Sequence, residues 1–227
     1  MPTSSDPSSY PDTRAWIRAL PALEGVTPPR MEAPPGSPYE LFLDWITKAV
    51  AAGVPEPQAA ALSTVDADGR PDARFLLLKD VTERGFWFSG AAHSPKGIEL
   101  ASNSAAALTF YWREQGRQVR VRGSVEEGGT AVSARDFRER SVTARAVAAA
   151  SRQSEVLGDP AEYERAVAAA VARIEAEPDF VSESWRAWCL VPDSVEFWQA
   201  DPGRRHQRLL YSRESGAGGW RAAQLWP

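Results

Sequence analysis

Short apolar runs separated by turn residues recur along most of the chain, and they constrain its fold more than any other feature. Residues 59–65 and 73–79 are strand-like and are joined by Asp66-Ala67-Asp68-Gly69, a sequence typical of a hairpin turn. Further strand-like runs cover residues 85–89, 105–112, 118–125, 187–191, 195–199, 208–212 and 220–225. This many strands joined by turns predicts an antiparallel sheet that forms a barrel.

Segments with helical character interrupt these strands. Residues 39–52 place apolar side chains at helical spacing, and Gly53 is a plausible end for this helix. Ser94 followed by Pro95 predicts a short helix to residue 101. Residues 130–150 have a helical composition, and the capping box at 159–162 opens a helix that extends to residue 175. We therefore predict a mainly β fold of the α+β class, with helices flanking the barrel.

The composition of the chain indicates where its domain begins and limits the classes of function that the protein can have. Residues 1–37 are rich in proline, serine and aspartate, which predicts a mobile arm, whereas residues 38–227 are expected to form one domain. The net charge of -4 argues against general attraction to nucleic acid or to an anionic membrane. No apolar run at the N-terminus indicates a signal peptide or a membrane span, so a cytoplasmic protein is expected.

Cysteine and histidine are scarce, which bears on the chemistry that the chain can perform. The single Cys189 excludes an intrachain disulfide and a cysteine-based zinc site. The two histidines, His93 and His206, are too few for a typical histidine-rich metal centre, so we expect no metal. An organic cofactor is therefore expected to carry any redox chemistry.

Three short segments are candidates for binding a planar anionic ligand. The run 204–208 places Arg204, Arg205, His206 and Arg208 directly behind an aromatic strand, although an arginine-rich turn is often simply solvated. Ser94-Pro95-Lys96 offers a hydroxyl, an ammonium and free helix N–H groups, which together suit a phosphate. The strand at 74–79 has a cation at each end, and its alternative interpretation is a core strand whose ends reach solvent.

Taken in order, these segments resemble the pyridoxamine 5'-phosphate oxidase family of FMN-dependent enzymes. The resemblance covers residues 38–227. It rests on RFLLLK at 74–79, GFWFSG and SPKGIEL within 85–100, FYW at 110–112, RQVRVRG at 117–123, RQS at 152–154, EFWQ at 196–199 and RRHQR at 204–208.

The resemblance implies an FMN-binding split β-barrel that forms a homodimer through a C-terminal dimerisation region, with FMN at the interface. It matches Arg74, Ser94, Lys96 and Arg208 to contacts with the flavin phosphate and ribityl chain. It also matches Gln118, Gln153, Ser154 and Trp198 to the ring or the cofactor wall, where amides suit the polar edge of the isoalloxazine. Further cofactor positions are Phe75, Leu76, Lys79, Ser89 and Gly90.

The resemblance also implies substrate positions. Lys79, Arg140, Arg204 and His206 fall where the family holds a phosphorylated substrate and its reacting amine, and Arg204 and His206 are the candidate catalytic residues. Arg205, which replaces an apolar residue of the family, is a further candidate for substrate binding. A cation at Arg204 would stabilise negative charge that develops on the flavin.

Two substrate positions depart from the family pattern. The family usually places a tyrosine, an arginine and a serine along one helix to bind the phosphate, and here these positions are Asp136, Arg140 and Ala144. An ionised Asp136 facing the pocket would repel a phosphate dianion. The alternative is that Asp136 pairs with Ser133 in a capping box and points away from the pocket.

The resemblance and its departures leave three candidate functions. The favoured prediction is an oxidase that removes two electrons from a C–N or ring C–H bond of a small heterocycle other than pyridoxamine 5'-phosphate, as in the phenazine-biosynthesis branch of the family, and passes them to O2. The alternatives are a genuine pyridoxamine/pyridoxine 5'-phosphate oxidase and a non-catalytic flavin-binding protein. The sequence leaves the substrate, the physiological electron acceptor and the pathway open.

Overall fold

The computed structural model describes residues 13–21, 23, 34–214 and 219–227. Most of the predicted N-terminal arm therefore lies outside the described residues, and its mobility stays a prediction. Within the arm, Thr13–Ala19 forms a short helix, α1, which buries none of its residues. The arm's composition disfavours helix, but this run contains no proline and therefore keeps every backbone N–H.

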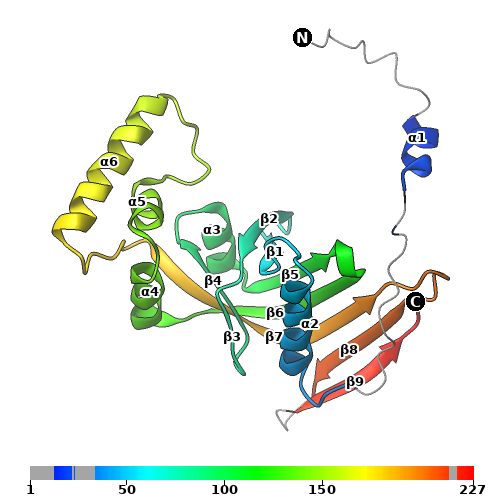
Figure 1. Cartoon of the computed structure of the whole chain (residues 1–227). Helices are drawn as coiled ribbons and strands as arrows, with labels where there is room; N and C mark the ends of the chain where they lie inside the picture. Colours follow the sequence, from blue (N-terminus) through cyan, green and yellow to red (C-terminus); the bar gives the residue numbers. More distant parts are fainter. Residues whose placement is uncertain (1–12, 22, 24–33, 215–218) are drawn as a thin grey trace.

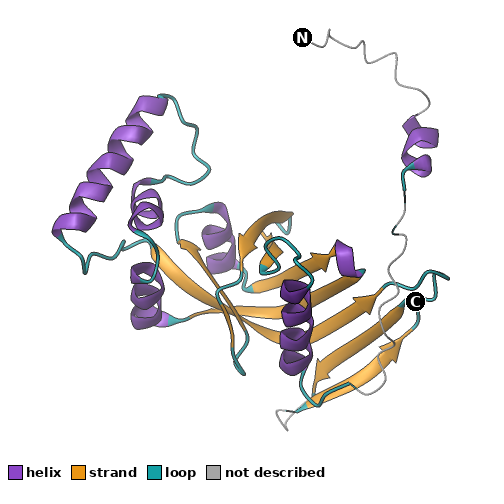
Figure 2. Cartoon of the chain, viewed as in Figure 1, coloured by secondary structure: helices purple, strands orange, loops and turns teal. Residues whose placement is uncertain are grey.

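The domain is built on one antiparallel sheet of nine strands (Figures 1 and 2). The strands are β1 (Ala59–Val65), β2 (Pro71–Leu77), β3 (Asp80–Val81), β4 (Phe86–Ala91), β5 (Ala105–Trp112), β6 (Arg117–Glu127), β7 (Trp185–Gln199), β8 (Gln207–Arg213) and β9 (Trp220–Leu225). Their order is β2-β1-β5-β6-β7-β4-β3, while β8 pairs with β7 and β9 pairs with β8. The curled sheet and its flanking helices confirm the predicted α+β split barrel.

The first hairpin forms as predicted, apart from its last residues. The Asp66 carboxylate accepts hydrogen bonds from the backbone N–H groups of Asp68 (2.9 Å) and Arg70 (2.8 Å), and Gly69 adopts a φ of +82° that favours glycine. Strand β2 ends at Leu77, so Lys79 lies beyond the strand to which the sequence assigned it. The Lys79 backbone N–H donates instead to the carbonyl of Trp87 on β4 (2.8 Å).

Strand β7 corrects the prediction of two strands at 187–191 and 195–199. The predicted strands leave out residues 192–194, but the strand continues through them because β7 contains a bulge there. Arg122 pairs with Ser194 and Gly123 pairs with Pro192, which leaves Asp193 as an extra residue on β7. The first half of β7 pairs with β4 and its second half pairs with β8, so one strand joins two parts of the sheet.

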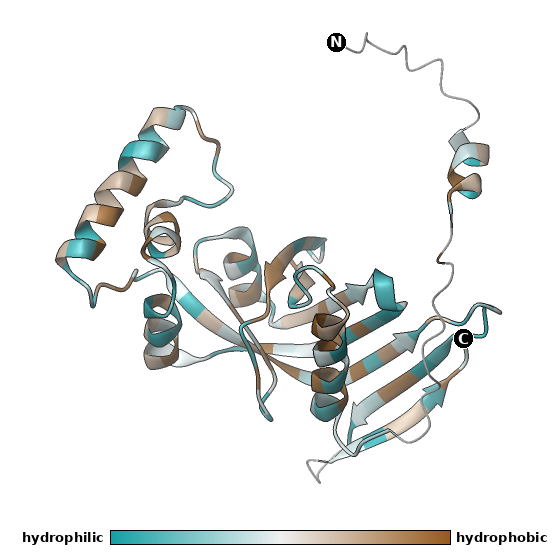
Figure 3. Ribbon diagram, viewed as in Figure 1, coloured by the Kyte–Doolittle hydropathy of each residue, from teal (hydrophilic) through white to brown (hydrophobic). Residues whose placement is uncertain are grey.

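The other helices are α2 (Pro38–Ala51), α3 (Pro95–Ser102), α4 (Gly129–Arg138), α5 (Val142–Ala150) and α6 (Pro160–Ala176), with a 3-10 turn at Arg113–Gln115. The helical region predicted at 130–150 is thus two helices, since Ser141 caps α5 by accepting from the Ala144 N–H at 3.2 Å. Figure 1 shows α4, α5 and α6 at one end of the sheet and β8 and β9 at the other. Figure 3 shows hydrophobic and hydrophilic residues alternating along α6.

The core lies between α2 and the sheet. The Phe42 ring contacts Phe86 and Phe110 with centroid distances of 5.0 and 4.9 Å, and Trp45 contacts Phe197 at 5.2 Å. Trp112 is only 2% exposed and belongs to this core, so it offers no apolar surface to a second copy of the chain. Large exposed apolar side chains occur instead at Phe75 on β2 and Ile98 on α3, among others.

Among the described residues, no helix combines the length and the apolar character needed to cross a bilayer.

Candidate functional site

A cleft of about 300 Å³ opens between β2, β4, α3 and α5, and we name it the β2–α3 cleft. Its lining brings together many of the residues predicted from the sequence. These are Arg74, Phe75, Leu76, Ser89, Gly90, Lys96, Arg140 and Gln153. Strands β2 and β4 and the first turn of α3 therefore place separate sequence motifs around one cavity.

The start of α3 places a buried ammonium in this cleft. The Lys96 Nζ donates to the Ser94 Oγ (3.0 Å) and to the Gln153 Oε1 (3.1 Å), and Lys96 is 7% exposed. Burial lowers the pKa of Lys96 below its usual value, the charge of Arg74 lowers it further, and Glu99 opposes both effects. Within the described residues Lys96 forms no salt bridge, so its ammonium is available to an anionic ligand.

Ser94 has a supporting position in the structure. Its hydroxyl donates to the Ala91 carbonyl (2.6 Å) and accepts from the Gly97 N–H (3.4 Å), which caps α3. Ser94 is fully buried and does not line the cleft. Its connection to a ligand would therefore run through Lys96.

Arg74 is held by a polar network beneath the cleft wall. Its Nη2 contacts Glu99 at 2.9 Å and Asp72 at 2.6 Å, and its Nη1 donates to the Thr64 hydroxyl. The same hydroxyl donates to Glu99, whose side chain is buried. The guanidinium thus has a fixed orientation beside Lys96.

Two features on β4 fit a bound flavin mononucleotide. The buried Ser89 Oγ has no hydrogen-bond partner among the described residues, which is costly unless a ligand supplies one. A Cβ atom at Gly90 would lie 2.7 Å from the Cε of Lys96, so glycine leaves room for the lysine. The cations and the unpartnered hydroxyl suit a phosphate and a polar cofactor edge.

Ser154 lies beside this cleft rather than in it. It lines a neighbouring pocket together with Gln153, which belongs to both cavities. Its backbone φ of +73° is unusual for a residue other than glycine.

One aromatic ring, that of Trp185, contacts two of the predicted substrate residues. The Trp185 Nε1 donates to the Asp136 Oδ2 (2.8 Å), and the Arg140 guanidinium lies 4.4 Å from the centre of the Trp185 ring. Burial lowers the pKa of Arg140, and the charge of Asp136 opposes this shift. The Arg140 Nη2 donates to the Ala144 carbonyl (3.2 Å), whereas its buried Nε has no partner among the described residues.

The proposed capping role of Asp136 is wrong. Asp136 lies near the end of α4, and Ser133 bonds elsewhere, donating to the Gly129 carbonyl (2.9 Å) and accepting from the Ala187 N–H (3.0 Å). Asp136 instead lines a cleft of about 410 Å³ together with Lys79. Lys79 and Asp136 are thus in a different cavity from Arg140.

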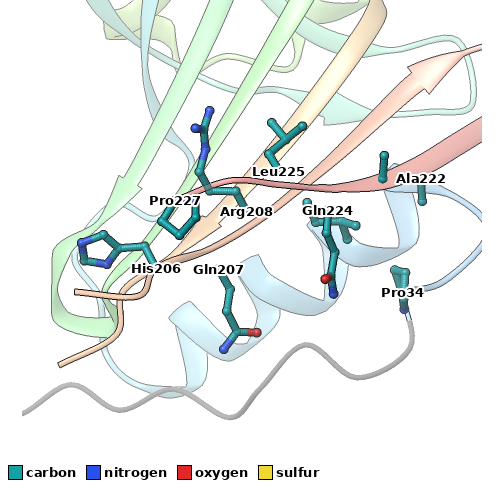
Figure 4. A pocket seen from close by; sticks show the side chains of 10 residues that line it. Pro34, His206, Gln207, Arg208, Ala222, Gln224, Leu225 and Pro227 are labelled. Atoms are coloured by element: carbon teal, nitrogen blue, oxygen red, sulfur yellow. The ribbon is translucent and has the colours of Figure 1, made fainter. Parts of the chain in front are cut away.

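A second predicted group lies at the other end of the sheet, around a pocket of about 280 Å³ that we name the β8–β9 cleft (Figure 4). His206 and Pro227 lie at one end of it and Pro34 at the other. The His206 ring lies 4.8 Å from the Trp198 ring, and its Nδ1 accepts from the Asp201 N–H (3.1 Å). Arg208, which also lines the cleft, donates to the buried Glu196 at 2.8 Å.

The remaining predicted residues surround this cleft without lining it. Gln118 pairs with Trp198 in the register of β6 and β7. Arg204 and Arg205 are exposed in the turn before β8, and Arg204 has a φ of +62°. Among the residues that the structure describes, the two clefts share no lining residue, so one chain does not bring the two predicted groups together.

Sequence reasoning missed several residues of these networks, among them Thr64, Glu99, Trp185 and Glu196. Glu99 had a local signal, because it follows Lys96 by three residues on a predicted helix and therefore lies on the same side. Trp185 meets Asp136 across 49 residues of chain, a contact that no short motif encodes.

The fold and the basic cleft at the start of α3 agree with the class predicted from the sequence, an FMN-dependent oxidoreductase on a split barrel. The family model for pyridoxamine 5'-phosphate oxidase matches residues 46–198, and the model for the pyridoxine 5'-phosphate oxidase C-terminal dimerisation region matches residues 185–227. The chain belongs to the pyridoxamine 5'-phosphate oxidase family. Membership confirms the predicted enzyme class and the cofactor FMN.

Named relatives and solved structures agree with this placement. The pyridoxine/pyridoxamine 5'-phosphate oxidases of Burkholderia vietnamiensis and Thermosynechococcus vestitus are each 44% identical over 191 residues, which is 84% of this chain and 89% of each relative. The crystal structure of PhzG from Burkholderia lata 383 in complex with tetrahydrophenazine-1-carboxylic acid is 31% identical, with a TM-score of 0.82 over 91% of this chain and 100% of that one. An FMN binding protein from Nostoc punctiforme (17% identity, TM-score 0.69, covering 84% of this chain and 98% of that one) shares the fold.

Proposed function

We propose that this protein is an FMN-dependent oxidase of a small heterocycle that carries a carboxylate, rather than of pyridoxamine 5'-phosphate. The observation that carries the proposal is the contact of one indole, that of Trp185, with both the Asp136 carboxylate and the Arg140 guanidinium. O2 is the proposed electron acceptor. Arg204 and His206 are the proposed catalytic residues.

The cofactor positions define where the flavin would bind. Arg74 and Lys96 would hold the phosphate, with Ser89 and Gln153 near the polar parts of the cofactor. When bound, FMN supplies the two-electron acceptor for the substrate. Gln118, Trp198 and Arg208 would reach the same flavin from a second copy of the chain, because in one chain they surround the β8–β9 cleft. This division supports a homodimer as the functional unit.

The charges of Asp136 and Arg140 favour a monoanionic substrate. The Nε of Arg140 is buried and has no hydrogen-bond partner among the described residues. Arg140 can therefore donate one more hydrogen bond to a ligand. Asp136 holds a carboxylate at the N–H edge of the same indole and partly offsets the charge of Arg140. A doubly charged phosphate would meet more repulsion from Asp136 than a singly charged carboxylate would.

The second departure from the family pattern, at Ala144, would also weaken phosphate binding. Ala144 has no hydroxyl, and its backbone carbonyl already accepts from Arg140. A phosphate oxygen would therefore lack the donor that the family resemblance places there. The PhzG structure similar to this chain was solved with tetrahydrophenazine-1-carboxylic acid, which is a ring carboxylate.

Purified holoprotein provides the test. Flavin reduction without oxygen, followed by oxygen consumption, is measured with pyridoxamine 5'-phosphate and with a panel of dihydro-heterocycle carboxylic acids. We expect efficient turnover of a member of the panel and poor turnover of the phosphate ester. The double variant Asp136→Tyr with Ala144→Ser should raise kcat/KM for pyridoxamine 5'-phosphate by about 10-fold or more, since each change restores roughly one hydrogen bond or removes one repulsion.

The matched control is Glu139→Gln, which removes a carboxylate from the same cleft as Asp136 but has no bond to Trp185. It should leave kcat/KM for pyridoxamine 5'-phosphate nearly unchanged. A micromolar KM for pyridoxamine 5'-phosphate in the unmodified protein would refute the proposed substrate class.

The 44% identity to pyridoxine/pyridoxamine 5'-phosphate oxidases favours a second candidate, an oxidase that makes pyridoxal 5'-phosphate. The same assay separates the two. In that case the phosphate ester would be the best substrate, and the Asp136→Tyr change would bring no gain.

A further inference from the structure

The first two turns of α3 carry two buried charges of opposite sign. Lys96 and Glu99 are three residues apart, which places them on one side of the helix. The lysine lines the β2–α3 cleft, whereas the glutamate contacts Arg74 on the neighbouring strand β2 at 2.9 Å. One helix thus contributes a cation to the cleft and an anchor for a second cation.

We propose that Glu99 is a positioning residue for the FMN phosphate, because it fixes the Arg74 guanidinium on the cleft wall beside Lys96. This inference rests on the proposed phosphate-binding role of Arg74 and Lys96.

The anchor has more than one contact. Thr64 on β1 is buried and donates its hydroxyl to Glu99, and Arg74 donates to the same hydroxyl through Nη1. Asp72 holds Nη2 from its exposed side at 2.6 Å. Side chains on α3, β1 and β2 thereby hold both Nη atoms of the guanidinium. Its Nε–H and one Nη1–H remain for a ligand.

Positioning and simple electrostatics predict opposite results when Glu99 loses its charge. A carboxylate near an anion site repels the anion, so its neutralisation alone would strengthen phosphate binding. If the main role of Glu99 is to orient Arg74, neutralisation would weaken phosphate binding, since a mobile arginine loses entropy when the ligand orders it. The sign of the change therefore identifies the role.

The experiment compares FMN with riboflavin, which has the same ring and ribityl chain but no phosphate. Flavin-free full-length protein is titrated with each ligand, and binding is followed by quenching of flavin fluorescence. We expect Glu99→Gln to weaken FMN binding about tenfold, the size of one charge-assisted hydrogen bond, and to leave riboflavin binding unchanged. Glu126→Gln is the matched control, since it breaks an exposed 2.6 Å ion pair with Arg84 and should alter neither affinity.

Thr64→Val serves as a second variant that alters the anchor without a change of charge. It should weaken FMN binding about threefold, again with no effect on riboflavin. Tighter or unchanged FMN binding by Glu99→Gln, or an equal loss of both ligands, would overturn the inference. If the glutamine variant fails to fold, an unchanged FMN affinity in Thr64→Val overturns it as well.

Arg74→Ala separates this inference from the proposed cofactor site. If it removes the preference for FMN over riboflavin while Glu99→Gln does not, only the role of Glu99 is wrong. If Arg74→Ala also leaves the preference intact, the assignment of the phosphate site itself is wrong, and the inference falls with it.

Discussion

The β2–α3 cleft and the β8–β9 cleft are both basic, but they hold their cations in different ways. In the first cleft Lys96 is buried and Arg74 is anchored by Glu99, Thr64 and Asp72. In the second region Arg204 and Arg205 are exposed on a turn, and Arg208 alone of these arginines is held by a buried carboxylate. On the proposed assignment, one chain would supply Arg74 and Lys96 to the flavin phosphate, whereas Arg208 and the exposed arginines would reach the same flavin from a second copy.

The largest effect is expected when the second copy of the chain, which would supply the other wall of the site, is lost. Phe75 lies on the rim of the β2–α3 cleft and is 80% exposed, so it is a candidate for the surface that meets another copy. Phe75→Asp should convert the dimer to a monomer and weaken FMN binding by about 100-fold, because a two-fold interface would bury the new charge twice. Sedimentation velocity with flavin absorbance measures both quantities.

Val50→Asp is the control for this change, since Val50 is 62% exposed on α2 and does not line either cleft. It should leave the dimer and its flavin intact. A Phe75→Asp protein that remains a flavin-loaded dimer would contradict this placement of the interface. A monomer of the unmodified protein that binds FMN tightly would contradict the split site altogether.

An intermediate effect is expected from the two arginines that share Glu196. Arg208 contacts Glu196 at 2.8 Å and lines the β8–β9 cleft, whereas Arg120 contacts it at 3.4 Å and does not. Arg208→Ala should weaken FMN binding about 30-fold, and Arg120→Ala less than about threefold. Fluorescence titration measures both, and equal retention of flavin by the two variants would show that the β8–β9 cleft takes no part in cofactor binding.

The smallest effect is a dependence on pH that is confined to the first cleft. Burial lowers the pKa of Lys96 below its usual 10.5, so the folded protein loses this proton at a lower pH than the unfolded chain does. FMN affinity should fall as pH rises through this lowered pKa, by about tenfold as the ammonium is lost. The stability of the flavin-free protein should rise over the same interval, since the unfolded chain then binds more protons.

Lys96→Arg is the control, because a guanidinium keeps its proton throughout this range. Titrations of FMN at a series of alkaline pH values should show the affinity loss in the unmodified protein and a smaller loss in this variant. Superimposable profiles would mean that the loss belongs to the flavin or to another group rather than to Lys96.

Local sequence signals predicted the parts of the fold that depend on local chemistry. Ser94-Pro95 defined the start of α3, and the aspartate-glycine turn defined the first hairpin. The continuity of β7 was missed because a bulge compensates for Pro192 through pairing with Gly123, 69 positions earlier in the chain. The same limit applies to the site: Lys96 was found from a cap, whereas the bond between Trp185 and Asp136 exists only in the folded protein.

The length of β7 has a consequence for the assembled enzyme. This single strand begins at Trp185, on the wall of the β2–α3 cleft, and reaches Trp198 and Gln199 beside the other cleft. At roughly 3.3 Å per residue, its ends are about 46 Å apart along the strand. In the proposed dimer the two clefts of one chain belong to different active centres, so β7 would act as a spacer of fixed length between the two flavins. Interface side chains could then change in evolution without altering how far apart the two centres lie.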